Sequence, residues 1–303
     1  MIIYVKQIII SPLTYKKILR EIYFLLFVKN QNFFIELNDM RINKEKQKAF
    51  LLFKGNYVNL HQFINLTNFN YLSDKGLIKW IIFQITFGLY LLHYNNIIHN
   101  DIKPSNILID EVGGILICDL GSATYEKEII HEFSSSYIAP EFLYGNSISN
   151  EKLDIWGLGV IMLELFLKTN EIFKVESQDT NNKNQLEFIL SKFGINQCMF
   201  KEEIDKLFND ENNPKCIILD ETQIEKIKDE NAIDLIRHLL ILNPKHRYSA
   251  EQVLQSKYLQ EYLGLNLKIK KIQNPINYNI LSDNMNRDSF LENYEKLNSA
   301  LKN

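Results

Sequence analysis

Cysteine, arginine and early glycine are scarce in this sequence. Three cysteines are spread over 303 residues without a C-x-x-C pair, which argues against a disulfide framework or a zinc site and favours reduced thiols in the cytoplasm or nucleus. The few arginines are each candidates for a planar contact with a carboxylate or phosphate. No glycine precedes residue 55, so a glycine-rich phosphate-binding loop is missing from the first part of the chain.

The charge balance and the apolar segments argue against two classes of partner. A net charge of -3 and a pI near 6.1 provide no overall basic surface to attract nucleic acid or an anionic membrane. The apolar stretch 77–93 contains Lys79 and Gln84, and the stretch 153–167 is shorter than the roughly 20 residues that span a bilayer. We therefore expect no nucleic-acid or membrane partner, and we interpret both stretches as helices buried in a globular lobe.

Hydrophobic periodicity predicts a strand-rich beginning and a helical remainder. A helix is predicted over 13–29, and a turn at 54–56 separates the two parts. Residues 119–150 lack periodicity and are expected to form an extended loop. The predicted strands are 2–10, 33–38, 49–53, 106–109 and 115–118, and the further predicted helices are 77–93, 154–168, 184–193, 231–241 and 249–256.

Residues 261–303 are interpreted as a C-terminal tail. Within it, Phe290, Tyr294, Leu297 and Leu301 recur at intervals of four, three and four, which places them on one stripe of a helix. Two roles are open for this stripe. It could dock onto the body of the protein, which we favour, or it could bind a partner.

The segment H-N-D-I-K-P-S-N at 99–106 carries side chains suited to phosphoryl transfer. That reaction needs a carboxylate at the attacking hydroxyl, a cation at the phosphates and magnesium ions that bridge them. Asp101 would accept or orient the hydroxyl proton, and Lys103 would reach the transferred phosphate. Asn106 would bind a metal through its amide oxygen, and Asp119, thirteen residues further on, would be the main magnesium ligand.

Five motifs in this order resemble those of eukaryotic protein kinases, over about residues 1–260. After the segment at 99–106 come D-L-G at 119–121, A-P-E at 139–141, D-I-W-G-L-G at 154–159 and N-P-K-H-R at 243–247. The K-P-S-N form is similar to the cyclin-dependent and mitogen-activated (CMGC) group. The resemblance implies an α+β bilobal fold, with a small, incomplete β-rich N-lobe plus one helix over 1–55 and a large, mainly helical C-lobe over 56–260.

The N-terminal region resembles the same family and implies further site residues. I-Y-V-K-Q-I at 3–8 and L-R-E-I-Y-F-L-L at 19–26 align with a strand and the mobile helix of cyclin-dependent kinases. On that alignment Lys6 contacts the nucleotide phosphates and pairs with Glu21. The stretch 50–63 aligns with the hinge, which implies the following contacts: Phe53 as gatekeeper, backbone groups of Lys54 and Asn56 at adenine, Asn59 near the ribose, and Leu108 under the base.

Other matched residues are expected to support the fold. The resemblance implies that Glu141 pairs with Arg247 and that Asp154 accepts backbone hydrogen bonds beneath the catalytic loop. It also implies that His99 is a packed core histidine rather than a base, stacked with Leu120 and Leu25.

Four departures separate the chain from its family. The glycine-rich loop is missing, because the chain starts at what would be the third strand. Tyr4 replaces a small alanine that touches adenine, and Ile138 replaces an arginine before A-P-E, which leaves proline-directed substrate choice open. Asn100 replaces the arginine that grips a phosphorylated activation loop, so we expect little control by loop phosphorylation. Ser134 is expected to hydrogen-bond Asp101 and Lys103.

These residues predict a serine/threonine protein kinase that uses ATP and Mg²⁺ to phosphorylate protein hydroxyls, with Lys103 favouring Ser/Thr over Tyr. The missing loop favours the alternative of a pseudokinase that binds or scaffolds. A small-molecule kinase is a weaker third interpretation, because such enzymes usually lack the A-P-E platform. By family analogy, a regulatory partner is expected to dock on the helix 13–29.

Overall fold

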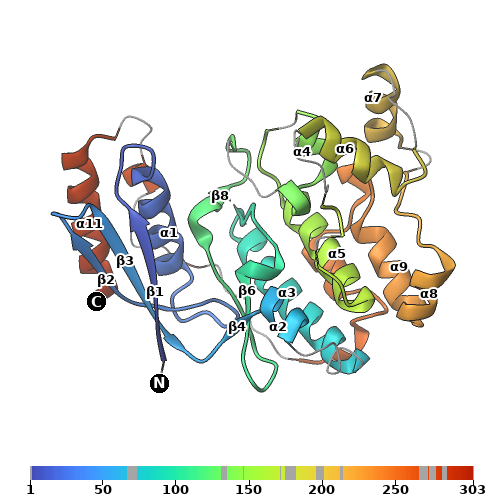
Figure 1. Cartoon of the computed structure of the whole chain (residues 1–303), viewed down its shortest axis with the longest axis horizontal. Helices are drawn as coiled ribbons and strands as arrows, with labels where there is room; N and C mark the ends of the chain where they lie inside the picture. Colours follow the sequence, from blue (N-terminus) through green and yellow to red (C-terminus); the bar gives the residue numbers. More distant parts are fainter. Residues whose placement is uncertain are drawn as a thin grey trace.

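The computed structural model describes residues 2–66, 74–130, 135–145, 147–170, 172–174, 182–195, 201–211, 214–265, 272, 278–281 and 285–302. A small strand-rich lobe lies on one side of the molecule and a larger helical lobe on the other (Figure 1). This confirms the predicted α+β bilobal fold.

The N-lobe is built on a three-stranded antiparallel sheet. Its strands are β1 (Ile2–Ile9), β2 (Leu37–Asn43) and β3 (Lys48–Gly55), in the order β1-β3-β2. Helix α1 (Tyr15–Phe27) lies beside this sheet (Figure 1). Among the described strands none pairs with the outer edge of β1, and large apolar side chains such as Ile3 and Val5 are about half exposed there.

One predicted strand is placed differently. The run 33–38 was expected in the sheet, but β2 begins only at Leu37. Residues 33–35 instead bond to the C-lobe, where Ile117 N donates to Phe33 O at 2.7 Å and Ile35 N donates to Ile117 O at 3.1 Å. The apolar side chains of Phe34 and Ile35 are buried there, so tertiary packing outweighed the local strand pattern.

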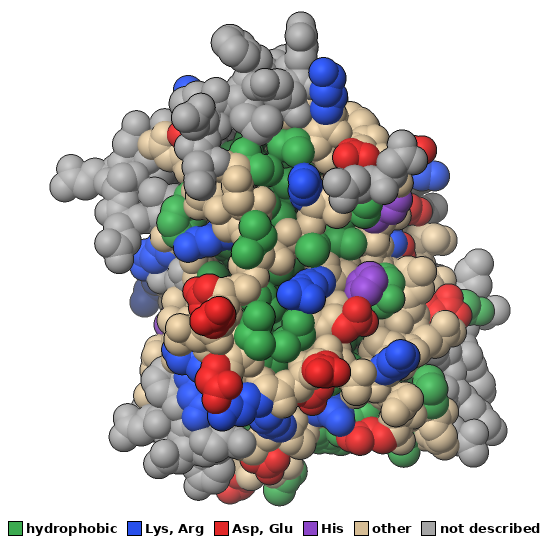
Figure 2. All heavy atoms as spheres, turned by 90° about the vertical axis from the view of Figure 1, so that its right-hand side faces the viewer, with side chains coloured by type: hydrophobic (Ala, Val, Ile, Leu, Met, Phe, Trp, Pro, Cys, Tyr) green, Lys and Arg blue, Asp and Glu red, His purple; other side chains and the backbone are tan. Residues whose placement is uncertain are grey.

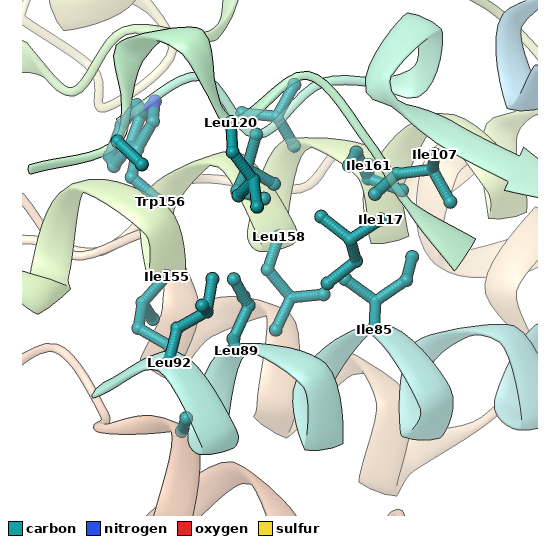
Figure 3. Packing of buried hydrophobic residues seen from close by; sticks show 14 of the residues in the cluster. Ile85, Leu89, Leu92, Ile107, Ile117, Leu120, Ile155, Trp156, Leu158 and Ile161 are labelled. Carbon is teal, nitrogen blue, oxygen red and sulfur yellow. The ribbon is translucent and has the colours of Figure 1, made fainter. Parts of the chain in front are cut away.

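The C-lobe core lies between two long helices. Helix α3 (Lys75–Tyr94) and helix α5 (Glu151–Leu167) face each other through isoleucine and leucine side chains, with Ile107, Ile117 and Leu120 above them (Figure 3). Asp74 caps α3 by accepting hydrogen bonds from the backbone of its first turn. By length and composition α3 could cross a membrane, but 67% of its most apolar window is buried inside the fold, as expected for a core helix.

The remaining elements surround this core. Four of them, α2, α4, α7 and α8, were not predicted as helices, and α4 lies within the stretch 119–150 that was expected to be an extended loop. Asp220 and Gln223 form a capping box that marks the start of α8. The α-helices are α2 (Leu60–Leu66), α4 (Pro140–Leu143), α6 (Asn182–Ser191), α7 (Lys201–Asn209), α8 (Glu221–Ile227), α9 (Glu230–Leu239) and α10 (Ala250–Leu254). The short strands are β4 (Val58–Asn59), β5 (Ile97–Ile98), β6 (Ile107–Ile109), β7 (Ile115–Ile117) and β8 (Thr124–Tyr125).

The end of the C-lobe carries charges of both signs. Figure 2 shows Lys and Arg side chains interspersed with Asp and Glu on this face, and small apolar areas between them. On the part of this face that the structure describes, charge of one sign is not gathered into a broad patch.

The tail returns to the N-lobe. Helix α11 (Arg287–Lys302) lies alongside α1 (Figure 1), and its stripe residues Phe290, Tyr294 and Leu297 are buried. Of the two roles left open for this stripe, docking onto the body is the one that the structure shows.

Candidate active site

The loop 99–106, called the catalytic loop below, is hydrogen-bonded to a buried carboxylate. Asp154, fully buried in α5, accepts hydrogen bonds of 2.8 Å from the backbone N–H groups of His99 and Asn100 and from His93 Nε2. These are the backbone bonds expected for Asp154. Gly157, one turn further along α5, lets the helix pass directly under the loop, because a Cβ at this position would lie 2.6 Å from the Ile102 carbonyl oxygen.

Asp101 is held in place by two neighbours from its own loop. Asn106 Nδ2 donates to the Asp101 backbone oxygen at 2.8 Å and to Asp101 Oδ2 at 2.9 Å. Lys103 Nζ lies 2.9 Å from the same Oδ2 atom. The carboxylate, the ammonium group and the amide therefore form one connected group on the loop 99–106.

Lys6 links strand β1 to helix α1 and to the D-L-G segment through two carboxylates. Its Nζ lies 2.7 Å from Glu21 Oε1 and 2.7 Å from Asp119 Oδ1. The predicted Lys6–Glu21 pair is thus present, and Asp119 adds a contact that sequence reasoning did not anticipate. Asp119 has a left-handed backbone conformation (φ 60°, ψ 65°) at the turn from β7 into the following segment.

Burial and charge act in opposite directions on this trio. Burial raises the pKa of Glu21 to about 7, because the nearby Lys6 offsets only part of the cost of a buried charge. Burial would also raise the pKa of Asp119, but Lys6 outweighs it and the net pKa is below the ordinary value. For Lys6 burial acts to lower the pKa, and the two carboxylates raise it overall. Asp119 is therefore ionised at neutral pH.

The donor set suits a hard divalent cation. Both N–H groups of the Asn106 amide point to Asp101, which leaves the amide oxygen for another ligand. Asp119 and Asn106 line the same hollow, and carboxylate and amide oxygens are the ligands that Mg²⁺ accepts in proteins. Among the described residues, no three His, Cys, Asp or Glu side chains gather as a further metal site.

The hollow between the lobes has a volume of about 630 Å³, counting space that is open to solvent, and a mixed lining. Lys6, Glu21, Asn106 and Asp119 supply polar groups, while Tyr4, Ile35, Phe53, Tyr57, Leu108 and Cys118 supply most of the apolar wall. Phe53 and Leu108 therefore lie where the predicted base pocket needs them.

Three predicted nucleotide contacts are not part of this lining. Lys54, Asn56 and Asn59 lie outside it. The side chain of Asn59 accepts a hydrogen bond of 2.8 Å from Gln62 N at the start of α2, and Asn56 lines a separate hollow. Their predicted roles at adenine and ribose remain predictions, and Tyr57 occupies this part of the wall instead.

The Tyr4 side chain is hydrogen-bonded to the backbone of Tyr57, in the stretch that aligns with the hinge. Its hydroxyl donates to the Tyr57 backbone oxygen at 2.7 Å and accepts from Tyr57 N at 3.1 Å. Gly55 is required beside it, since a Cβ there would lie 1.8 Å from the Tyr57 ring. The tyrosine that replaces the family's alanine thus forms a wall of the hollow and is fixed by two hydrogen bonds. No sequence spacing indicated this pairing.

Asn100 belongs to a closed ring of three hydrogen bonds. Asn100 Nδ2 donates to Thr124 Oγ1 at 2.8 Å, Thr124 Oγ1 donates to Ser149 Oγ at 2.9 Å, and Ser149 Oγ donates to Asn100 Oδ1 at 2.8 Å. Asn100 Nδ2 also reaches the Ser122 backbone oxygen at 3.0 Å. Neutral groups therefore hold the segment after D-L-G to the catalytic loop. The predicted contacts of Ser134 lie outside the described residues.

A buried ion pair supports the far end of this segment. Arg247 contacts both oxygens of Glu141, at 2.8 and 3.0 Å, and also donates to the backbone oxygens of Ile241 and Lys152. The pairing is the one expected from the resemblance. His99 and Leu120 are fully buried and Leu25 nearly so, and His99 Nε2 lies 3.1 Å from the Cys118 oxygen, in keeping with a packed core histidine.

Beside Asp101 lies a second, smaller hollow. It is lined mainly by apolar side chains, including those of Ile102, Ile130, Ile138 and Phe142. Ile138, which stands in place of the family's arginine, is buried at its wall. A substrate segment that reaches Asp101 would meet an apolar surface here.

Comparison with known proteins agrees with this geometry. The family model described as "Protein kinase domain" matches residues 2–259. Cyclin-dependent kinase 8 from Drosophila melanogaster is 29% identical over 275 residues, which cover 80% of this chain and 60% of that protein. The aligned region thus spans less than two thirds of the length of this relative.

Proposed function

Because this chain belongs to the protein kinase family, we propose that it transfers the γ-phosphate of ATP to serine and threonine hydroxyls of proteins. One observation carries the proposal. Lys6, Glu21 and Asp119, from both lobes, are linked by contacts of 2.7 Å and line one hollow together with Asn106, which in turn holds Asp101 beside Lys103 by contacts of 2.8 to 2.9 Å. A protein that only binds has no chemical need for this set.

The residues divide the work between the two substrates. Asp101, oriented by Asn106, would accept the proton of the attacking hydroxyl, and Lys103 would neutralise charge on the transferred phosphoryl group. Lys6, fixed by Glu21, would hold the phosphates of the nucleotide. Asn106 and Asp119 would hold Mg²⁺, which neutralises negative charge on the phosphates when it is bound.

A pseudokinase is the second candidate, and the open edge of β1 favours it. Among the described residues, no strand pairs with that edge, so this part of the chain supplies no backbone donors from a further strand to the phosphates of a bound nucleotide. One such preorganised donor can change a rate by about a hundredfold or more. We therefore expect slow turnover rather than none.

Transfer of labelled phosphate from ATP to a generic protein substrate tests the proposal. The wild-type chain should transfer label, and Asp119→Ala should not, while both proteins unfold at similar temperatures in the absence of nucleotide. A matched control is Asp234→Ala, which removes a carboxylate from the surface of α9. If the wild-type chain transfers no label and MgATP does not raise its unfolding temperature, the pseudokinase interpretation is correct.

The preference among substrates follows from two residues. Lys103 beside Asp101 favours Ser/Thr hydroxyls, by resemblance to the family. The apolar wall at Ile138 favours an apolar residue next to the acceptor, because a charged side chain would lose its hydration there.

The relative's name describes a kinase that depends on a cyclin, and a cyclin-like partner on α1 is the corresponding proposal for this chain. In the structure the outer side of α1 is already packed against α11. Such a partner would have to bind beside this helix or displace it.

A further inference from the structure

We propose that the C-terminal residues 278–281 and 285–302, called the tail below, hold α1 in the position that forms the Lys6–Glu21 pair. The tail would do within one chain what a separate regulatory partner does by docking on that helix. The role assigned to the Lys6–Glu21 pair rests on the proposed function, but the packing of the tail against α1 does not.

Helix α11 runs parallel to α1 over almost its whole length. The rings of Tyr15 and Phe290, near the beginnings of the two helices, stack at a centroid distance of 4.6 Å and an angle of 16°. Beyond the other end of α1, Lys29 Nζ donates to the Leu301 backbone oxygen at 3.0 Å. That oxygen belongs to the last turn of α11, where carbonyl groups lack helical partners and favour a cation.

The surface of α11 that contacts α1 is apolar, and its residues recur at helical spacing. Phe290 and Leu297 are fully buried, and Tyr294 is 3% exposed. Burying side chains of this size contributes about 1.5–3 kcal/mol each relative to leaving them exposed. The apolar stripe of the tail is therefore strong enough, by this estimate, to act as a fixed support rather than a loosely attached end.

A second anchor lies at the other side of α1. The ring of Tyr278 packs against Tyr23 (5.2 Å) and Phe24 (5.8 Å) of α1 and against Tyr125 (4.6 Å) of β8. The hydroxyl groups of Tyr23 and Tyr125 lie 3.1 Å apart. Tyr278 thus packs between α1 and the segment that follows D-L-G. The tail therefore contacts both the helix that carries Glu21 and the segment that begins after Asp119.

Glu21 lies between these anchors along α1 and points away from the face that carries Tyr15. Six residues at 100° per residue place it about 240° around the helix from Tyr15, toward Lys6 rather than α11. An outward movement of α1 would separate Glu21 from Lys6, whereas α11 and Tyr278 block that movement. The sheet cannot provide this support alone, because its outer strand β1 is unpaired on one edge among the described strands.

The test compares two stacked aromatic pairs. Phe290→Ala removes the ring that stacks on Tyr15, and Phe208→Ala removes the ring that stacks on Tyr144 in the C-lobe, at 5.3 Å and 23°. We expect amide hydrogen exchange in residues 15–27 to become at least tenfold faster in Phe290→Ala and to stay unchanged in Phe208→Ala. Phe290→Leu, which keeps most of the apolar volume, should restore slow exchange.

If Phe290→Ala does not fold, a second variant provides an independent test. Tyr278→Ala removes the other anchor and should accelerate exchange in the same residues. Unchanged exchange over 15–27 in a folded Phe290→Ala or Tyr278→Ala protein would overturn the proposal.

If the tail acts on the active site by positioning α1, its effect on MgATP binding must depend on Glu21. Phe290→Ala should weaken MgATP binding by about fivefold or more, because the competent position of α1 becomes less populated. In a Glu21→Gln background the same substitution should have no further effect on MgATP affinity, and an additive effect would contradict a positioning role. If MgATP does not bind even to the wild-type chain, the proposed function fails, while the exchange data still decide the support of α1.

Discussion

The two walls of the active site are supported in different ways. The C-lobe wall, with Asp101, Lys103 and Asn106, rests on buried groups such as Asp154 and on helices that are apolar on all sides. The N-lobe wall, with Lys6, belongs to an edge strand whose side chains are largely exposed. The groups proposed for proton transfer and metal binding are therefore built on a firmly packed base, while the lysine proposed to hold the phosphates depends on α1 and, through it, on the tail.

The largest expected effect is on the C-lobe wall. Asp101→Asn should lower the rate of phosphate transfer about 10²- to 10⁴-fold, because the amide cannot accept the hydroxyl proton. The unfolding temperature should change little, since the amide is close in size to the carboxylate. Steady-state kinetics with a protein substrate measures this, and a loss below tenfold would remove Asp101 from its proposed role.

A stability measurement tests how firmly the C-lobe wall is held. Glu141→Ala leaves Arg247 buried without its carboxylate and should lower the free energy of unfolding by about 3–5 kcal/mol. Glu211→Ala breaks the exposed contact with Lys245 and should cost less than about 1 kcal/mol. Urea unfolding of both variants compares them directly, and equal losses would show that burial of the first pair does not matter.

We expect the hydrogen-bonded ring of Asn100, Thr124 and Ser149 to hold the segment after D-L-G in place without a phosphate group on that segment. Ser149→Ala opens the ring and leaves the Asn100 side-chain oxygen without this donor and the buried Thr124 hydroxyl without this acceptor, which should cost about 1–3 kcal/mol. Treatment of the wild-type protein with phosphatase should leave its transfer rate within a few-fold. A collapse of activity to background after phosphatase treatment would show that a phosphate, and not the ring, orders this segment.

The smallest effect concerns the N-lobe wall and depends on pH. The folded protein keeps a proton on Glu21 up to about pH 7, whereas the ordinary value is 4.5. The contribution of Glu21 to stability is therefore complete below about pH 4.5 and is lost as the pH rises to 7. The free energy of unfolding of the wild type relative to Glu21→Gln should fall by about 1–2 kcal/mol over that interval. Urea unfolding at several pH values measures it, and a constant difference would contradict the raised pKa.

Prediction from sequence was most direct where the candidate site residues lie close together in the chain. Asp101, Lys103 and Asn106 lie within one loop, and the long helices α3 and α5 are marked by long, mostly apolar stretches. Placement of the run 33–38 failed, because its apolar residues suit a sheet or a buried contact equally well, and the position of Ile117 decided between them.

The sequence by itself determined the family and the two-lobed fold, and it placed the residues proposed for proton transfer and metal binding within short motifs. Only the tertiary structure decided that Tyr4 is tied to Tyr57, that Asn100 closes a ring with Thr124 and Ser149, and that the tail supports α1. The physical reason is that short motifs encode groups brought together by local backbone geometry. Contacts between distant segments depend on how whole helices and strands pack, and common residue types such as tyrosine and serine carry no spacing that would reveal them.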